Sequence, residues 1–152
     1  MAGEIQVRPI DAAETIPLRH AVLRPGRPEE SAHFAGDHEA TTRHLGIFVD
    51  KELLSIASLF AAAMPGQPGS RAFQLRGMAT AAHARGRGLG QLLVHQCVIL
   101  AKEMKAEILW CNARTSAVGF YQKLGFQVSG AEFDVPTVGP HFLMWLALDS
   151  GV

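Results

Sequence analysis

Hydrophobic residues alternate with polar ones, or form continuous β-type runs, in four segments of the first half of the chain. These patterns predict strands over residues 4–8, 44–49, 53–62 and 71–80. The short turn at 50–52 joins the second and third runs and therefore predicts a hairpin. Glycines and prolines at 65–69 then turn the chain into the fourth run. We expect the last three of these strands to be antiparallel.

A helix is predicted between the first two strands. Asp11 and Glu14 have the spacing of a capping box, and the helical stretch that follows ends near Arg24. Because proline donates no helical hydrogen bond, Pro17 allows a second possibility, in which the helix starts later than the capping box indicates. The polar segment 29–43 carries weak signals and predicts a short helix or a loop.

Apolar residues recur every three or four positions after Gly88, which predicts a long helix with one apolar face packed on a sheet. Strand-like runs at 71–80 and 107–112 flank this helix, and such a crossover implies parallel neighbouring strands. A second helix over 116–124 ends at Gly125, and strands from 126 and over 141–148 follow. The predicted fold class is therefore α/β. Its mixed sheet has antiparallel N-terminal strands and a parallel central pair, and helices flank it.

Length and charge narrow the class of protein. The 152 residues suit a single domain over 1–152. The formal net charge is zero, so no basic field would hold nucleic acid or an anionic membrane. The first residues lack a leader pattern, and the longest apolar run, 53–64, is too short to span a bilayer. Cys97 and Cys111 have no paired spacing. We expect a cytoplasmic protein whose cysteines are core residues.

A glycine-rich segment lies between a predicted strand and the long helix: Arg85, Gly86, Arg87, Gly88, Leu89 and Gly90. Its glycines let a ligand approach the backbone, and the unpaired N–H groups and positive dipole end of the helix favour an anion. A dinucleotide-binding loop would need a glycine at Gln91, and the Gly-Lys-Ser/Thr ending of a Walker A loop is absent. The alternative is a simple helix-starting turn with two solvated arginines.

Arg85, Gly88 and Gly90 have the spacing of the acyl-CoA pyrophosphate loop of the GCN5-related N-acetyltransferase (GNAT) family, which this segment resembles. The family's second signature is similar to residues 108–113 followed by 117–126. The resemblance covers about 71–148 well, and the earlier residues only in the order of their elements. The ending at 140–144, Pro-His-Phe-Leu-Met, resembles that of a bacterial subgroup with a Pro-His-x-x-Met strand.

The resemblance implies that acetyl-CoA is the co-substrate and that its pantetheine arm lies in a gap between two parallel strands. The backbone of three residues, Met78, Ala79 and Thr80, would face the arm, and the N–H groups of 85–90 would bind the pyrophosphate. Asn112 resembles the polar residue that contacts the cofactor or the substrate. The loop at 81–84 lacks the proline and the acidic residue that are common there in the family.

Tyr121 is the only tyrosine in the chain. It is similar in position to the family's group that protonates the leaving CoA thiolate, and it would also contact the cofactor. A phenol stays protonated at neutral pH and can donate to a sulfur anion. Its alternative is a half-buried aromatic residue bonded to a carbonyl. The reaction implied is direct attack of a primary amine on the thioester. A non-catalytic acyl-CoA sensor or scaffold is the other class of function.

No single residue can be identified from the sequence as the general base that deprotonates the amine. His141 is the histidine we single out for a base or substrate role, because a Gly-Pro turn would present its imidazole at the end of the sheet. Glu132 and Asp134, expected on the preceding loop, are weaker candidates. The strand at 71–80 contains no acidic residue, although several relatives have their base there.

The acceptor is a small-molecule or peptide amine that the sequence does not identify. Arg76 and Arg114 could each face an acidic part of this acceptor, and a surface salt bridge is the alternative for both. The histidines at 33, 38 and 44 fit no standard ligand spacing. We therefore expect no metal there, and a polar loop at the edge of the acceptor pocket. The family also often pairs as homodimers.

Overall fold

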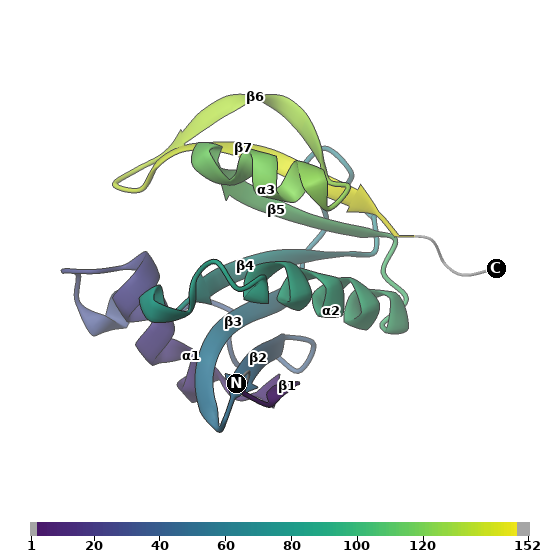
Figure 1. Ribbon diagram of the computed structural model, residues 1–152. Helices are drawn as coiled ribbons and strands as arrows, with labels where there is room; N and C mark the ends of the chain where they lie inside the picture. The colour runs from purple at the N-terminus through teal and green to yellow at the C-terminus, as the bar shows by residue number, and fades with distance from the viewer. Residues whose placement is uncertain (1–2, 149–152) are drawn as a thin grey trace. The chain divides into compact units, whose positions relative to one another are not determined.

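The structure is a computed structural model that describes residues 3–148 of the 152-residue chain (Figure 1). Within these residues seven strands form one sheet in the order β1-β2-β3-β4-β5-β7-β6. The strands are β1 (Ile5–Ile10), β2 (Arg43–Val49), β3 (Glu52–Ala61), β4 (Ala72–Thr80), β5 (Ile108–Arg114), β6 (Gln127–Val135) and β7 (Gly139–Ala147). The first strands are antiparallel and β4 runs parallel to β5, which confirms the predicted fold class.

Helices connect these strands. The α-helices are α1 (Ala12–Leu18), α2 (Leu89–Glu103) and α3 (Val118–Lys123). A π-helix, Arg19–Leu23, continues α1, and shorter 3-10 helices span Glu29–Ala32, Ala82–Ala84 and Thr115–Ala117. The segment 29–43 thus begins with a short helix before a looped stretch, as its weak signals indicated.

The chain divides into two compact units. The first comprises Met1–Phe60 and Leu75–Leu100, and the second comprises Ala61–Gln74 and Ala101–Val152. The single domain over 1–152 stays a prediction from the sequence.

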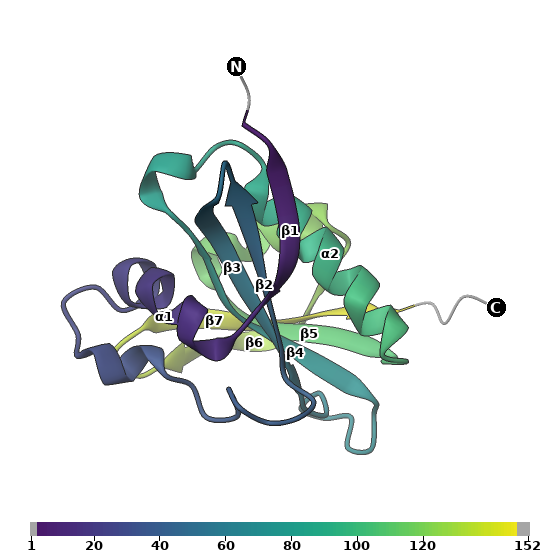
Figure 2. The ribbon, with the colours of Figure 1, turned by 90° about the horizontal axis from the view of Figure 1, so that it is seen from below.

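In the first unit, β1, β2 and β3 lie side by side as an antiparallel ribbon (Figure 2). The β2–β3 hairpin has a two-residue turn in which Asp50 and Lys51 have φ angles of 48° and 73°. This left-handed geometry matches the twist of paired strands. The turn is one residue shorter than predicted, because Glu52 already pairs with Val49.

The capping box at the start of α1 is present, since the Asp11 N–H donates to Glu14 Oε1 at 3.0 Å. Pro17 does not delay the helix and lies inside it. Because Pro17 has no N–H for the carbonyl of Ala13, the regular helix loses one bond there. The backbone then widens into the π-helix, where the Arg24 N–H reaches back five residues to Arg19 O at 3.1 Å.

In the second unit, β7 pairs antiparallel with both β5 and β6 and so lies between them. β4 and β5 pair in parallel, from Ala72 opposite Ile108 to Gln74 opposite Trp110. The Trp110 indole packs with Met64 and Ala72 and donates its Nε1–H to Ala62 O at 2.9 Å. This buried tryptophan ties the segment before β4 to the middle of β5.

Candidate functional site

Two glycines of the glycine-rich loop, which lies in the first unit, have left-handed backbone conformations. Gly86 and Gly88 have φ angles of 81° and 77°, and a Cβ at either would meet no atom within 4 Å. Glycine is therefore needed here for its backbone conformation, while the space above it is open. The first bond of α2 joins Leu92 N–H to Gly88 O at 3.1 Å, so the amides of 89–91 have no partner inside the helix.

Two positively charged side chains lie just before the start of this helix. Arg85 and Arg87 are both exposed, whereas the Leu89 side chain is buried and anchors the first turn. Gly90 is the second residue of α2. The loop thus exposes two cations beside the start of α2.

The end of β4 precedes this loop. Ala79 is buried in the core with Ile10, Phe48 and Ile56, while Met78 and Thr80 are half-buried. The Thr80 hydroxyl lies 2.9 Å from the hydroxyl of Ser55, a residue of β3 that is fully buried. Sequence reasoning missed this anchor, because a serine in an apolar strand gives no pairing signal.

A buried ion pair, also missed from the sequence, lies under the 33–37 loop of the first unit. Arg19 is completely buried and donates to both carboxylate oxygens of Asp37, at 2.8 and 3.0 Å. The same guanidinium donates to Ala32 O and Ser58 Oγ, each at 3.0 Å. Burial opposes the charge on Asp37, but the hydrogen bonds from Arg19 and from the Phe34 N–H lower the pKa of that carboxyl.

His44 completes this network. Its Nε2 lies 3.0 Å from Asp37 O and its Nδ1 lies 2.6 Å from Ser58 Oγ. Because a carbonyl oxygen only accepts, Nε2 carries the proton and a neutral ring accepts at Nδ1 from the Ser58 hydroxyl. In the part of the chain that the structure describes, no three His, Cys, Asp or Glu side chains are grouped as a metal site requires.

Arg76 of β4 lies against aromatic rings instead of carboxylates. Its guanidinium carbon is 4.6 Å from the centre of the Phe34 ring and 5.2 Å from that of Phe60. Within residues 3–148, the Arg76 side chain makes no hydrogen bond or ion pair, so the salt-bridge alternative does not hold for it. Burial and the nearby Arg19 lower the pKa of Arg76.

Tyr121 lies on α3 in the second unit. It is 7% exposed, and its ring makes edge contacts with Phe120 and Phe126 at centroid distances of 5.0 and 5.3 Å. Gly125 has a φ of 96°, and the Phe126 N–H bonds back to Tyr121 O at 3.1 Å. The predicted glycine stop of the helix is confirmed, and it folds the aromatic pair around the tyrosine.

His141 lies near the start of β7 and is 6% exposed. Its Nδ1 is 2.8 Å from Gly139 O, and the carbonyl can only accept, so Nδ1 carries the proton. In the neutral form of this ring, Nε2 has the lone pair that a general base requires. The ring stacks on Phe133 at 6.0 Å, and the backbone of His141 pairs with that of Arg114.

Two further predicted positions lie on β5. Asn112 and Arg114 are both exposed and, being two residues apart, project from the same face of the strand. Glu132 and Asp134 lie within β6, which corrects their predicted loop position. The Glu132 carboxylate accepts a bond from the Thr115 hydroxyl at 2.7 Å, beside a register shift in β6.

Cys97 and Cys111 are both buried, and burial raises the pKa of each thiol to about 12. Both thiols therefore stay protonated at neutral pH, which removes them as nucleophiles. Their predicted place in the core is confirmed.

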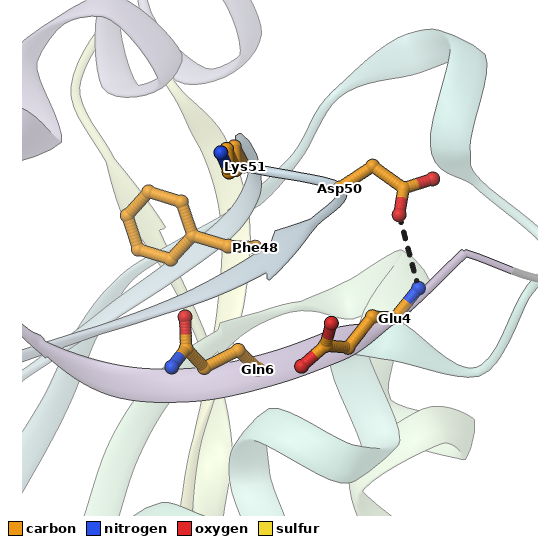
Figure 3. Close-up of a pocket in the computed structure, with 5 residues that line it drawn as sticks. All are labelled: Glu4, Gln6, Phe48, Asp50 and Lys51. Atoms are coloured by element: carbon orange, nitrogen blue, oxygen red, sulfur yellow. Dashed lines mark hydrogen bonds between the residues drawn. The ribbon is translucent and has the colours of Figure 1, made fainter.

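A surface hollow of about 320 Å³ lies at the β1–β2 edge, lined by Glu4, Gln6, Phe48, Asp50 and Lys51 (Figure 3). The Asp50 carboxylate is turned to the Glu4 amide, which donates to it at 3.1 Å. The hollow contains no residue of the predicted acetyl-CoA or acceptor sites.

Comparison with known proteins identifies the class. Residues 44–128 match the family model of the acetyltransferase (GNAT) domain. The chain therefore belongs to the GNAT family, and it is an enzyme of the N-acetyltransferase class.

Among its relatives is YitI of Bacillus subtilis (strain 168), an uncharacterized N-acetyltransferase. The two are 35% identical over 144 residues, which cover 95% of this chain and 97% of YitI.

Solved structures share the fold. Escherichia coli ElaA superposes with a TM-score of 0.77 at 17% identity, over 93% of this chain and 99% of its own. An aminoglycoside 6'-N-acetyltransferase complexed with coenzyme A has a TM-score of 0.76 at 12% identity, over 95% and 97% of the two chains. Among the helices of residues 3–148, none is both long and apolar enough to cross a bilayer.

Proposed function

We propose that the protein transfers an acetyl group from acetyl-CoA directly to a primary amine. The observation that carries this proposal is the glycine turn at Gly86 and Gly88, which leads directly into α2 and contains two exposed arginines, Arg85 and Arg87. Backbone amides at the positive end of a 15-residue helix suit a pyrophosphate. Membership of the GNAT family supports acetyl-CoA as the donor.

The cofactor would be held mainly by backbone groups. In this proposal the amides of 85–90 bind the pyrophosphate, and the backbone of 78–80 hydrogen-bonds the pantetheine arm as a strand would. The side chains of Asn112 and Tyr121 are also proposed to contact the cofactor.

The chemistry needs one proton acceptor and one proton donor. His141 Nε2 takes the proton of the acceptor ammonium, and the free amine attacks the thioester carbonyl carbon. The C–N bond forms as the C–S bond breaks, and the Tyr121 hydroxyl protonates the leaving CoA thiolate. The proton that the new amide nitrogen loses then restores the Tyr121 phenol. No acyl-enzyme intermediate is needed.

Two arginines point to an acceptor with an acidic part. The half-buried Arg76 makes no ion pair within the described residues, and the exposed Arg114 is the register partner of His141. A carboxylate on the acceptor would accept bidentate bonds from a guanidinium. A small-molecule or peptide amine as the acceptor, the Pro-His-x-x-Met subgroup, a homodimer and a cytoplasmic location all stay predictions.

Acetyl-CoA is expected to bind with micromolar affinity in a calorimetric titration, whereas ATP and NAD bind far more weakly. Replacing Arg85 and Arg87 together by Gln weakens acetyl-CoA about tenfold, because each exposed cation contributes modestly to phosphate binding. Arg27→Gln, at an exposed arginine remote in sequence from the loop, serves as the control and leaves the affinity unchanged. If the wild type did not bind acetyl-CoA, the loop would have no cofactor-binding role and would only start the helix.

His141→Gln is expected to lower kcat about 10²-fold and to remove the acidic limb of the pH–rate profile, because the base is lost. CoA release is followed with an amine panel of amino acids, polyamines, aminoglycosides and short peptides. His95→Gln, at an exposed histidine of α2, is the matched control and keeps both rate and profile. An unchanged acidic limb in the His141 variant would assign the base elsewhere.

A further inference from the structure

Three guanidinium groups lie around the ring of Phe34 in the first unit. The guanidinium carbons of Arg19, Arg76 and Arg24 lie 3.9, 4.6 and 5.6 Å from the ring centre. Like charges repel, so such a cluster needs the negative face of an aromatic ring or a compensating anion. One anion, Asp37, is already bound to Arg19.

Phe34 is itself held rigidly by that ion pair. Its N–H donates to Asp37 Oδ2 at 2.9 Å, and its ring lies against the guanidinium that Asp37 fixes. Gly77 allows the approach from β4: a Cβ there would lie 3.2 Å from Arg19 Nε and 3.3 Å from Phe34 Cε2, at a φ of +68°. The backbone of β4 and the Phe34 loop are therefore in close contact next to Arg76.

Arg76 is oriented without using its hydrogen-bond donors. Phe34 and Phe60 contact the guanidinium, and none of its N–H groups bonds to a residue within 3–148. A planar guanidinium stacked on rings keeps its donor edge available, whereas one fixed by a carboxylate does not.

We propose that Phe34 is a positioning residue that holds the Arg76 guanidinium with its N–H edge ready for the acidic part of the acceptor. The proposal rests on the acceptor role proposed for Arg76. Arg19 and Asp37 act one step further back, because they hold Phe34. Preordering of Arg76 saves rotamer entropy that a free arginine would lose on binding.

The positioning itself is measured by NMR relaxation of the Arg76 Nε–Hε group, which needs no substrate. In the wild type this group is expected to be rigid, with a high order parameter. We expect the Arg76 Nε–Hε group to become mobile in Phe34→Leu. It should stay rigid in Phe34→Tyr, which keeps the aromatic ring. Phe48→Leu is the matched control, since Phe48 stacks under Arg8 at 3.9 Å instead. An Arg76 that stays equally rigid in Phe34→Leu overturns the proposal.

The consequence for binding is measured with succinate as the carboxylate probe and succinamide as its uncharged control, on the CoA-loaded protein. Phe34→Leu is expected to weaken succinate about tenfold and leave CoA affinity unchanged. In an Arg76→Met background the same change has no further effect, as a residue acting through Arg76 requires. An equal loss in that background would contradict the positioning role. If the wild type does not bind succinate, the acidic-acceptor role of Arg76 fails, and the relaxation measurement alone decides the positioning of its side chain.

Discussion

Tyr121→Phe is expected to lower kcat about 10³-fold while acetyl-CoA affinity stays within about twofold of the wild type, because only the proton donor is removed. The ring of Tyr121 packs between Phe120 and Phe126, and phenylalanine keeps those edge contacts. The variant therefore retains the fold of α3 and loses one hydroxyl. Steady-state rates with the best amine of the panel, together with calorimetry of acetyl-CoA, provide the two readouts.

A second experiment varies the acidity of the leaving thiol. A donor that carries a more acidic thiol needs less protonation as it departs, so the loss caused by Tyr121→Phe should shrink with such a donor. Phe120→Leu alters the neighbouring ring without removing a hydroxyl and serves as the control. An unchanged kcat in Tyr121→Phe would assign the proton donor to water or to another group.

Asp37→Asn is expected to destabilise the protein by about 3–5 kcal/mol, because it leaves the fully buried Arg19 without its anionic partner. Urea unfolding at neutral pH measures this change in the free energy of unfolding. Asp50→Asn is the control: Asp50 is exposed and accepts one bond from Glu4, so its replacement changes stability by about 0.5 kcal/mol or less.

The same pair predicts a pH dependence. The pKa of Asp37 is lowered in the folded protein, so its stabilising contribution is fully present above the ordinary carboxyl pKa. That contribution is lost as the pH falls through the folded pKa, and the wild type and Asp37→Asn then converge in stability. A double variant, Arg19→Met with Asp37→Leu, is expected to recover most of the loss, because no buried charge remains unpaired. A double variant as unstable as Asp37→Asn would contradict this account.

Local rules predicted the elements whose signals lie within a few residues. The capping box at Asp11 and Glu14, the β2–β3 hairpin and the stop at Gly125 all follow from contacts between near neighbours, and each is present. Boundaries were less certain, because Pro17 is tolerated inside a helix that then widens at Arg19.

The candidate site was predictable only where a motif is continuous. The loop 85–90 and the aromatic pair at Tyr121 could be identified from residue types and spacing. Arg19 gave no such signal: its burial depends on Asp37 and Ser58, which lie 18 and 39 residues away in the chain. The stacking of Arg76 on Phe34 is equally a product of distant segments.

The sequence alone determined the order of helices and strands, the glycine turn before α2 and the membership of a family that acetylates amines, because these depend on local backbone preferences and short motifs. Tertiary structure alone decided that β7 lies between β5 and β6, that Arg19 is buried beneath Phe34, and that the Gly139 carbonyl sets the tautomer of His141. These outcomes depend on pairing, burial and hydrogen bonds that exist only once the chain has folded, and no periodic pattern encodes them.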